Sequence, residues 1–338
     1  MRTTYHDRMP MTAASASSDL STQVARLFFD RQLSKVEIAA RLGISRFRVA
    51  RLIDGALADG LVRIEYRDIP ADDRELAGVL EERFGLDLCA VAVVAVDEAK
   101  DDVQAGTATF SAVARLAAEI LHGLISSGDV IGVAWGSTLA AVVREIPPRS
   151  DPDLEVVQLA GSSARLDRGR DSGELARVLA DRLGATHRAI YAPAFVETAA
   201  LRSALLREPE VADTVARFRV LDLAIVGIGA MPAGDGSAAS SLVQSGVLDE
   251  TEVLRLVALG AVGDLVVHPF DATGRFVAPD LAERAVAIGV EELRRVRRVV
   301  AVASGMRKAA AIRGALASGV VRMLVTDGPT ARAVLGGA

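Results

Sequence analysis

The sequence predicts an α/β fold in two parts, with a small helical module near the N-terminus and a larger parallel-sheet domain behind it. From Leu86 onward, short runs rich in Val, Ile and Ala alternate with segments of helical periodicity. That pattern is typical of a parallel sheet covered by helices on both faces. Before that point, two short helical segments meet at a glycine turn. The chain has 338 residues, 51% of them hydrophobic, which is enough apolar material for a core in each part.

The helical module has clear start and stop signals. Ser34 and Glu37 form an S-x-x-E capping box, which predicts a helix from residue 35. Gly43 can take the positive φ that ends this helix, and Ser45 is a suitable N-cap for the next one. An earlier helical segment around Val24 should pack behind this pair. The side chains that we expect in the buried seam are Val36, Ile38, Leu42, Ile44, Val49, Leu52 and Ile53.

The outward face of the second helix suits the major groove of DNA. The side chains that we expect there are Ser45, Arg46, Phe47, Arg48 and Arg51. After Gly60, apolar and charged residues alternate, which predicts the strand of a wing in which Arg63 contacts phosphate. Residues 21–67 hold nine Lys or Arg against five Asp or Glu, a net of +4, so the rest of the chain carries −9. A basic module on an acidic body favours binding to double-stranded operator DNA, with a purely structural helical hairpin as the alternative.

Four segments follow from these patterns. They are a disordered leader over residues 1–20, a winged helix-turn-helix DNA-binding domain over 21–67, a linker helix over 68–85 and an α/β domain over 86–338. The apolar stripe of the linker helix allows it either to dock on the α/β domain or to pair with a second subunit. No apolar run approaches the ~20 residues that span a bilayer, so we expect a cytoplasmic protein without membrane contact. The single cysteine, Cys89, lies in an apolar run and excludes an intrachain disulfide.

Seven strands are predicted in the α/β domain. They are residues 88–96, 130–134, 154–159, 188–191, 221–228, 299–303 and 321–326. In parallel sheets, ligands bind beyond the carboxyl ends of the strands, where loops pass into helices. Two such loops combine glycine with two hydroxyl side chains, at Gly136-Ser137-Thr138 and at Gly161-Ser162-Ser163. The first is either a ligand-binding loop or an ordinary helix N-cap, and the second has the same chemistry.

A further strand-to-helix junction carries Lys308, one of only three lysines beside 36 arginines, which suggests an anionic partner. The alternative is a solvated helix residue. The glycines at 227 and 229 are not followed by a G-x-G-x-x-G fingerprint, and the histidines lack H-E-x-x-H spacing. We therefore expect neither a dinucleotide cofactor nor a metal ion.

Over residues 21–335 the sequence resembles the SorC family of bacterial sugar-responsive transcriptional regulators. The motifs that carry the resemblance are ISRFRVARLI, GVAWGSTL, VVQLAG, YAPAF, LAIVGIGAM, GAVGDLVVHPFDATG, AVASGMRKAAAIRGAL and VTDGPTARAVL, in the order and with the spacing of the family. The resemblance implies a Rossmann-like effector domain of the type found in sugar-phosphate isomerases, deaminases and coenzyme A transferases. It also implies a sugar or sugar-phosphate effector and a homo-oligomer, commonly a tetramer.

The resemblance assigns individual residues to the effector site. Residues 136–138 match the loop of the family that binds phosphate or hydroxyl groups, and 161–163 match a second loop, which more often has two glycines where this chain has Gly161 and Ser162. Asp264 and Asp271 match acidic positions near the pocket, and Lys308 matches the Gly-x-x-Lys element. Some relatives have a lysine beside the second loop, but this chain has Ala160 there, which excludes imine chemistry at that loop.

Two other classes of function remain as alternatives. The α/β domain could isomerise or deaminate a sugar phosphate, with Asp264 or Asp271 as general base and Lys308 as an electrostatic clamp. No histidine is paired with a carboxylate near these loops in the sequence, so we expect a protein that is not an enzyme. An architectural DNA-binding protein without a ligand would not explain the long α/β domain.

Overall fold

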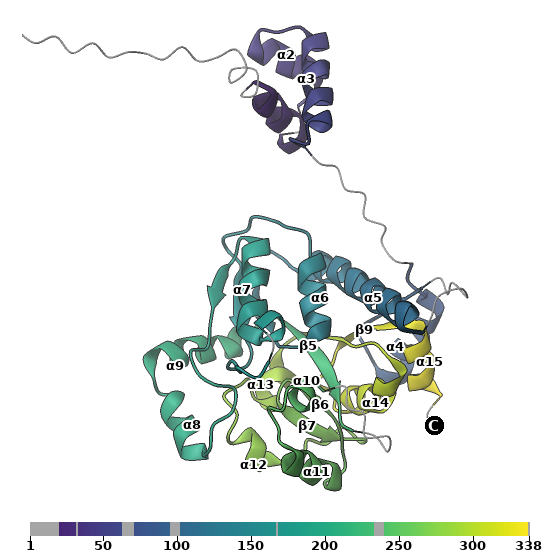
Figure 1. Cartoon of the computed structure of the whole chain (residues 1–338), viewed down its shortest axis with the longest axis vertical. Helices are drawn as coiled ribbons and strands as arrows, with labels where there is room; N and C mark the ends of the chain where they lie inside the picture. The colour runs from purple at the N-terminus through teal and green to yellow at the C-terminus, as the bar shows by residue number, and fades with distance from the viewer. Residues whose placement is uncertain are drawn as a thin grey trace, which may run out of the picture. The chain divides into compact units, whose positions relative to one another are not determined.

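The computed structural model describes residues 20–31, 33–62, 71–94, 102–166, 168–232 and 240–336. The chain divides into two compact units, Met1–Asp68 and Ile69–Ala338, which are drawn in Figure 1. The predicted wing from Arg63 onward and all but the last residue of the predicted leader lie outside the described residues. Within those residues, no helix is both long and apolar enough to cross a membrane.

The first unit is a small bundle of helices. Its elements are a helical stretch over residues 20–25, the π-helical turn η1 (Arg26–Asp30), α2 (Lys35–Leu42) and α3 (Arg46–Ala58). The predicted capping box is present, because the Ser34 amide donates to Glu37 Oε2 at 2.8 Å and the Glu37 amide donates to Ser34 Oγ at 3.3 Å. Gly43 ends α2 with a φ of +64°, and the Ser45 hydroxyl accepts from the Arg48 amide to begin α3.

The core of the first unit differs from the predicted seam at one position. Ile38, Val49 and Ile53 are buried, and the other predicted seam residues pack around them, except for Val36. Val36 is 65% exposed, so its assignment to the seam was wrong. It is the second residue of α2, where the helix has only begun and its side chain projects away from α3.

The second unit is a layered α/β structure around a nine-stranded sheet. Its strands are β1 (Leu88–Ala92), β2 (Val130–Val133), β3 (Glu155–Gln158), β4 (Thr186–Arg188), β5 (Leu223–Ala230), β6 (Ala261–Leu265), β7 (His268–Asp271), β8 (Arg298–Val302) and β9 (Met323–Asp327). The order across the sheet is β1-β9-β8-β5-β2-β3-β4, and all pairs along this path are parallel. The β6–β7 hairpin joins the free end of β5 in antiparallel orientation.

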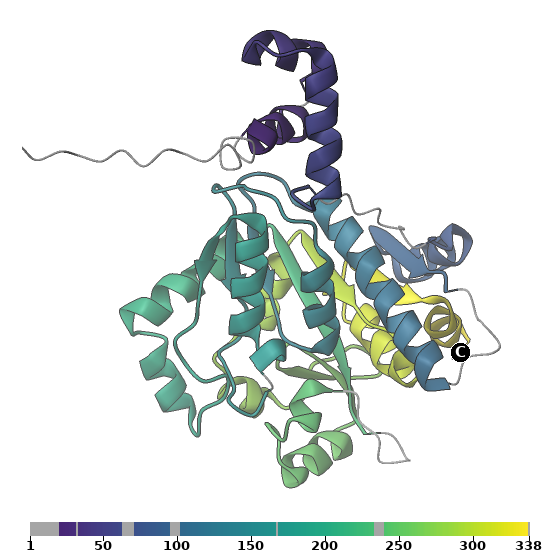
Figure 2. The ribbon, with the colours of Figure 1, turned by 45° about the horizontal axis from the view of Figure 1, so that its top comes forward.

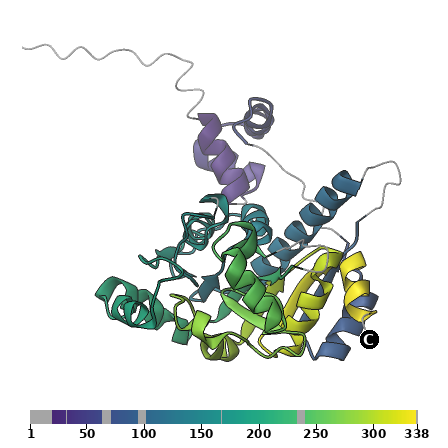
Figure 3. The ribbon, with the colours of Figure 1, turned by 60° about the horizontal axis from the view of Figure 1, so that its bottom comes forward.

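Helices cover both faces of the sheet. The longer helices are α4 (Arg74–Phe84), α5 (Asp102–Leu124), α6 (Ser137–Glu145), α7 (Ser172–Leu183), α11 (Glu250–Ala258), α14 (Ala309–Ala317) and α15 (Gly328–Leu335). The shorter ones are η2 (Arg168–Arg170), α8 (Ala199–Leu205), α9 (Pro209–Ala216), η3 (Arg217–Val220), α10 (Ser241–Gln244), α12 (Pro279–Ala282), α13 (Val290–Arg295) and η4 (Met306–Lys308). Helices α5, α6 and α7 lie side by side on one face (Figure 2), and α14, α15 and α4 form the other layer, with α4 beside the C-terminal helix (Figure 3).

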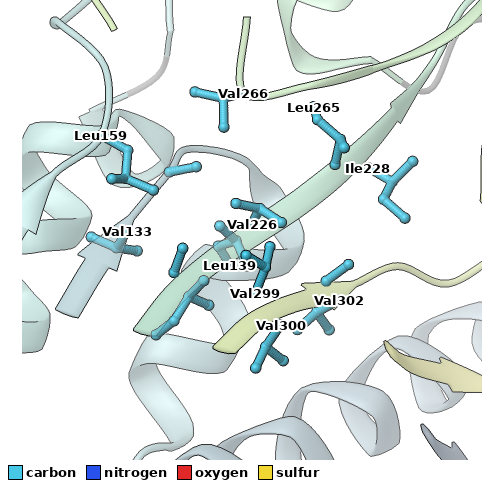
Figure 4. Close-up of a cluster of buried hydrophobic side chains, with 14 of the residues drawn as sticks. Val133, Leu139, Leu159, Val226, Ile228, Leu265, Val266, Val299, Val300 and Val302 are labelled. Atoms are coloured by element: carbon cyan, nitrogen blue, oxygen red, sulfur yellow. The ribbon is translucent and has the colours of Figure 1, made fainter. Parts of the chain in front are cut away.

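A single apolar core fills the space between these layers. Its centre contains Val133, Leu139, Val226, Val300 and their neighbours, contributed by β2, α6, β5 and β8 (Figure 4). The strands at this centre are buried on both faces, which is why their sequences are continuously apolar rather than alternating.

Three features of the sheet differ from the expected pattern. The strand expected at 188–191 is β4, which ends at Arg188, and β1 ends at Ala92. Asp264, which lies outside the seven predicted strands, is within β6. The β6–β7 hairpin was not predicted, because glycine, aspartate and proline interrupt its apolar pattern and its tight turn places Val266 at a φ of +59°.

The helix expected as a connector belongs by its contacts to the second unit. This helix is α4, and it packs against β1, the edge strand of the sheet. The Cys89 amide donates to Glu81 Oε1 at 2.7 Å, and Arg74 Nη1 donates to the Cys89 carbonyl at 2.9 Å. The Val91 amide donates to Asp72 Oδ1 at 2.8 Å, and the Asp73 amide donates to the Val91 carbonyl at 2.9 Å. The outward backbone groups of Cys89 and Val91 are therefore all paired.

Candidate functional site

The order of the strands defines one crevice at the carboxyl edge of the sheet. From β2 the chain continues outward to β3 and β4, and it then returns to place β5 on the other side of β2. Helices α6 and α7, which follow β2 and β3, cover one face of the sheet, whereas α14 and α15, which follow β8 and β9, cover the other. The loops after β2 and β5 therefore diverge and leave a crevice between them. Such a reversal is where ligands bind in open parallel sheets.

A pocket occupies this position, and we call it the switch-point pocket. It is lined by residues 134–139 after β2, residues 227–229 of β5, and the side chains of Ser241, Asp264, Val266 and Lys308. The structure thus brings together the first glycine-hydroxyl loop, one of the two predicted acidic residues and the predicted lysine.

The first loop presents an open helix end to the pocket. Gly136 is the N-cap of α6 at a φ of +124°, and it has no side chain to accept from the first amides of the helix. The carbonyl of Gly136 accepts the Ala140 amide, but the amides of the first turn precede the repeating hydrogen bonds of the helix. Unpaired amides and the helix dipole together favour an anionic or oxygen-rich group at this end.

Asp264 is the buried acceptor of the pocket. Its side chain lies opposite Gly229 in the β5–β6 pair and is 4% exposed. Among the described residues, Asp264 Oδ1 has no hydrogen-bond partner, and the same holds for Ser240 Oγ nearby. Burial raises the pKa of the Asp264 carboxyl to about 6, and the Ser240 hydroxyl and the Lys308 ammonium oppose this increase. A buried carboxylate oxygen without a donor is costly unless a ligand donates to it.

Lys308 places a cation in the same pocket. Its Nζ donates to the Ile228 carbonyl at 2.9 Å, which fixes the ammonium at the end of β5. Burial lowers the pKa of Lys308, and the negative charge of Asp264 opposes that decrease. Lys308 therefore points inward and is not the solvated helix residue of the alternative interpretation.

The second glycine-hydroxyl loop lies outside the switch-point pocket. Its hydroxyl and amide groups bind Asp171, with Ser162 Oγ donating to Asp171 Oδ2 and the Ser163 amide donating to Asp171 Oδ1, both at 2.9 Å. Asp171 is also the N-cap of α7. Gly161 packs against the backbone of residues 192–193, where a Cβ would lie 2.5 Å from the Ala192 carbonyl oxygen. This loop lines a separate surface groove.

Asp271 is also placed away from the pocket. Its Oδ1 accepts from the Thr273 hydroxyl at 2.6 Å and from the amides of Thr273 and Arg275, so it closes the turn after β7. The Thr273 hydroxyl and these other donors lower the pKa of Asp271. Its carboxylate is thus used locally, in contrast to that of Asp264.

Several residues of the pocket had no signal in the sequence. Gly229 allows Asp264 to approach, because a Cβ at Gly229 would lie 2.1 Å from Asp264 Oδ1. Val266 lines the pocket from a left-handed backbone conformation that β-branched residues rarely adopt, and such strain is often found at ligand sites. Ser241 lies in a run of small residues that looks like a linker. Among the residues that the structure describes, no group of His, Cys, Asp and Glu is placed to hold a metal ion.

The candidate DNA-binding residues lie together on the first unit. The side chains of Arg46, Phe47, Arg48 and Arg51 are exposed on α3, while Val49 and the rest of the opposite side of the helix are buried. Ser45 caps the helix with its hydroxyl oxygen. The expected outward face of this helix is confirmed as exposed, whereas its contact with DNA remains a prediction.

Comparison with known proteins identifies the family. Residues 70–336 match the family model described as "Putative sugar-binding domain". The chain is 32% identical over 323 residues to the erythritol catabolism regulatory protein EryD of Brucella abortus, covering 96% of this chain and 98% of that protein. The chain belongs to the SorC family of bacterial sugar-binding transcriptional regulators.

Two other similar proteins match over comparable lengths. The deoxyribonucleoside regulator of Bacillus subtilis is 28% identical, with 94% of this chain and 97% of that protein covered. The crystal structure of the full-length sorbitol operon regulator SorC from Klebsiella pneumoniae has a TM-score of 0.69 at 27% identity, covering 94% of this chain and 98% of that chain. The match to the sugar-binding domain model begins at residue 70, so it includes α4 and the segment that pairs with β1.

Proposed function

We propose that this SorC-family regulator holds operator DNA with α3 and releases or tightens its hold when a small sugar derivative occupies the switch-point pocket. The observation that carries the proposal is the combination in one pocket of three features: an uncapped helix N-terminus, the Lys308 ammonium and the buried Asp264 carboxylate. Among the described residues, Oδ1 of that carboxylate has no hydrogen-bond partner. The first two favour an anionic group, and the carboxylate favours hydroxyl donors.

The chemistry of the pocket favours a phosphorylated sugar or polyol. A phosphate would be placed at the N-terminus of α6 near Lys308, with the hydroxyl groups of the ligand directed toward Asp264. For a tenfold change in DNA affinity, the two ligands need a coupling free energy of only ~1.4 kcal/mol. We further propose a cytoplasmic homotetramer, in which several α3 helices contact half-sites; light scattering after size-exclusion chromatography tests the tetramer.

A thermal-shift screen of phosphosugars, polyols and free sugars tests the effector half of the proposal. A true effector at about 100 times its Kd should add about 2.7 kcal/mol of stability. Asp264→Asn should abolish this gain, and Asp271→Asn serves as the matched control because its carboxylate only closes a turn. If no compound stabilises the protein, or if both variants respond like the wild type, the proposed pocket is wrong.

Gel shifts with operator DNA test the other half. Arg48→Ala should reduce affinity for the operator, because its side chain is exposed at the start of α3. Arg26→Ala is the control, since Arg26 is exposed on η1 and outside the proposed contact surface. Equal affinity of Arg48→Ala and the wild type would exclude a contact with DNA at this residue.

One observation favours an enzyme as a second candidate function. A carboxyl with a pKa raised to about 6, beside the partly buried Lys308, is suitable for general acid-base catalysis on a sugar phosphate. The relatives are named as transcriptional regulators, and Asp264 and Lys308 are the only ionisable residues in the described lining of the pocket. A turnover assay on any stabilising ligand separates the two functions: conversion would show an enzyme, and an unchanged ligand a regulator.

A further inference from the structure

Phe47 is a large apolar side chain on the surface of α3, where the fold gives it no structural role. It is 68% exposed and takes no part in the core of the first unit. At 3.6 residues per turn, Phe47 projects from the side of α3 opposite to Val49, Ile53 and Ala56, which are the buried residues of this helix. Burial therefore cannot explain a phenylalanine at this position.

The neighbours of Phe47 place it in the proposed DNA-binding surface. It is the second residue of α3, and residues at the start of a recognition helix approach the base edges. Arg46 and Arg48 flank it, and Arg51 follows one turn later on the same side of the helix. The Arg46 guanidinium carbon lies 5.0 Å from the centre of the Phe47 ring, a cation–π arrangement that holds the two side chains together.

We propose that Phe47 reads thymine, by packing its ring against the 5-methyl group of a thymine in the major groove. This inference rests on the proposed DNA-binding function and adds a base preference to it. Among the four bases, only thymine presents a methyl group in the major groove, and phenylalanine is a side chain suited to that contact. The flanking arginines supply phosphate or guanine contacts, while Phe47 has no polar atom with which to bind any other base edge.

Uracil substitution in the DNA measures this contact directly. A high-affinity site is first selected from random DNA with the full-length protein, and each thymine is then replaced by uracil, which removes only the methyl group. We expect the wild-type protein to lose about fourfold in affinity per contacted methyl group. In a second series, cytosine replaces the contacted thymine. 5-Methylcytosine at that position, which restores the methyl group, should bind more tightly than unmodified cytosine.

Variants of Phe47 assign the effect to the ring. Phe47→Ala should bind the thymine site more weakly than the wild type and bind the thymine and uracil sites equally. Phe47→Leu, which keeps an apolar side chain, should preserve part of the discrimination and replaces Phe47→Ala if that variant binds too weakly to measure. Val36→Ala is the matched control, since Val36 is 65% exposed on α2 and should leave discrimination unchanged.

Two outcomes would overturn the inference. One is a wild-type protein for which uracil is as good as thymine at every position of the selected site. The other is a Phe47→Leu or Phe47→Ala protein that keeps the full discrimination of the wild type. A wild-type protein that selects no DNA site at all would instead contradict the proposed function, so the two failures are distinguishable.

Discussion

Two loops of the second unit have nearly the same sequence and opposite roles in the structure. Gly136-Ser137-Thr138 and Gly161-Ser162-Ser163 both follow a buried parallel strand and precede a helix. The first leaves the N-terminus of α6 without a side-chain cap and opens into the switch-point pocket. The second is closed by Asp171, which binds the Ser162 hydroxyl and the Ser163 amide. A glycine-hydroxyl loop is thus free for a ligand only where the chain does not supply its own acceptor.

The largest effect is expected from a substitution that fills the switch-point pocket. Gly229→Ala would place a methyl group 2.1 Å from Asp264 Oδ1, so the carboxylate must move. We expect loss of effector binding and a decrease of about 3 kcal/mol in the free energy of unfolding, as measured by titration calorimetry and urea denaturation. Gly227→Ala is the control for stability only, because the nearest atom to its added methyl group is 3.7 Å away, but Gly227 also lines the pocket. Effector binding by Gly229→Ala at wild-type affinity would contradict the assigned position of Asp264.

The free energy of unfolding should depend on pH through the ionisation of Asp264, with an effect almost as large. Its pKa is raised from 3.8 to about 6 in the folded protein, so folding disfavours the charged form. The wild type should lose about 2 kcal/mol relative to Asp264→Asn as the pH rises from 4 to 6, and the contribution of this group should become constant above about pH 7. Urea denaturation of both proteins between pH 4 and 7.5 measures the difference.

Effector affinity should change in the opposite direction over the same range. The wild type should bind more weakly below pH 6, where Asp264 is protonated and loses acceptor capacity, and Asp264→Asn should bind weakly throughout. A stability difference between the two proteins that does not depend on pH would show that Asp264 is ionised normally.

Opening the closed loop should lower stability without creating a binding site. Asp171→Ala removes the N-cap of α7 together with the acceptor for Ser162 and Ser163. We expect a loss of about 2 kcal/mol in the free energy of unfolding, while effector affinity stays at the wild-type value. A large loss of effector affinity in the folded variant would mean that the second loop also contacts the ligand.

Single hydroxyl deletions give the smallest and most direct comparison. Ser162→Ala should lower the free energy of unfolding by about 1 kcal/mol, because its hydroxyl binds Asp171 and Gln158. Ser137→Ala should leave the stability of the ligand-free protein unchanged, since Ser137 is exposed at the open helix end, and should weaken effector binding severalfold. If Ser162→Ala weakened effector binding and Ser137→Ala lowered stability, the roles that we assign to the two loops would be wrong.

Local signals in the sequence predicted local structure well. The capping box at Ser34, the glycine turn at residue 43 and the continuous apolar strands all depend on neighbours within a few residues. The β6–β7 hairpin could not be found in this way, because its position is set by pairing with β5 and packing under α14. Its turn at Val266 even contradicts local preference.

The set of residues that line the pocket could not be predicted from local sequence patterns, because it depends on the order of the strands in the sheet. The sequence singled out loops at the carboxyl ends of the strands, but the order of the strands decides which loops meet, and β2 lies next to β5 as well as next to β3. The two acidic residues at 264 and 271 looked equivalent in the sequence. Only the structure shows that Asp271 satisfies its own turn, whereas Asp264 faces a glycine in the neighbouring strand.

The paired edge strand β1 has a consequence for how copies of this protein meet. The outward backbone groups of Cys89 and Val91 are occupied by residues 72–74 and Glu81, so an approaching strand finds no hydrogen bonds to make there. Subunits therefore cannot extend the sheet across this side, and any assembly there has to use side-chain surfaces. The same closure removes a template for cross-β aggregation at this edge of the sheet.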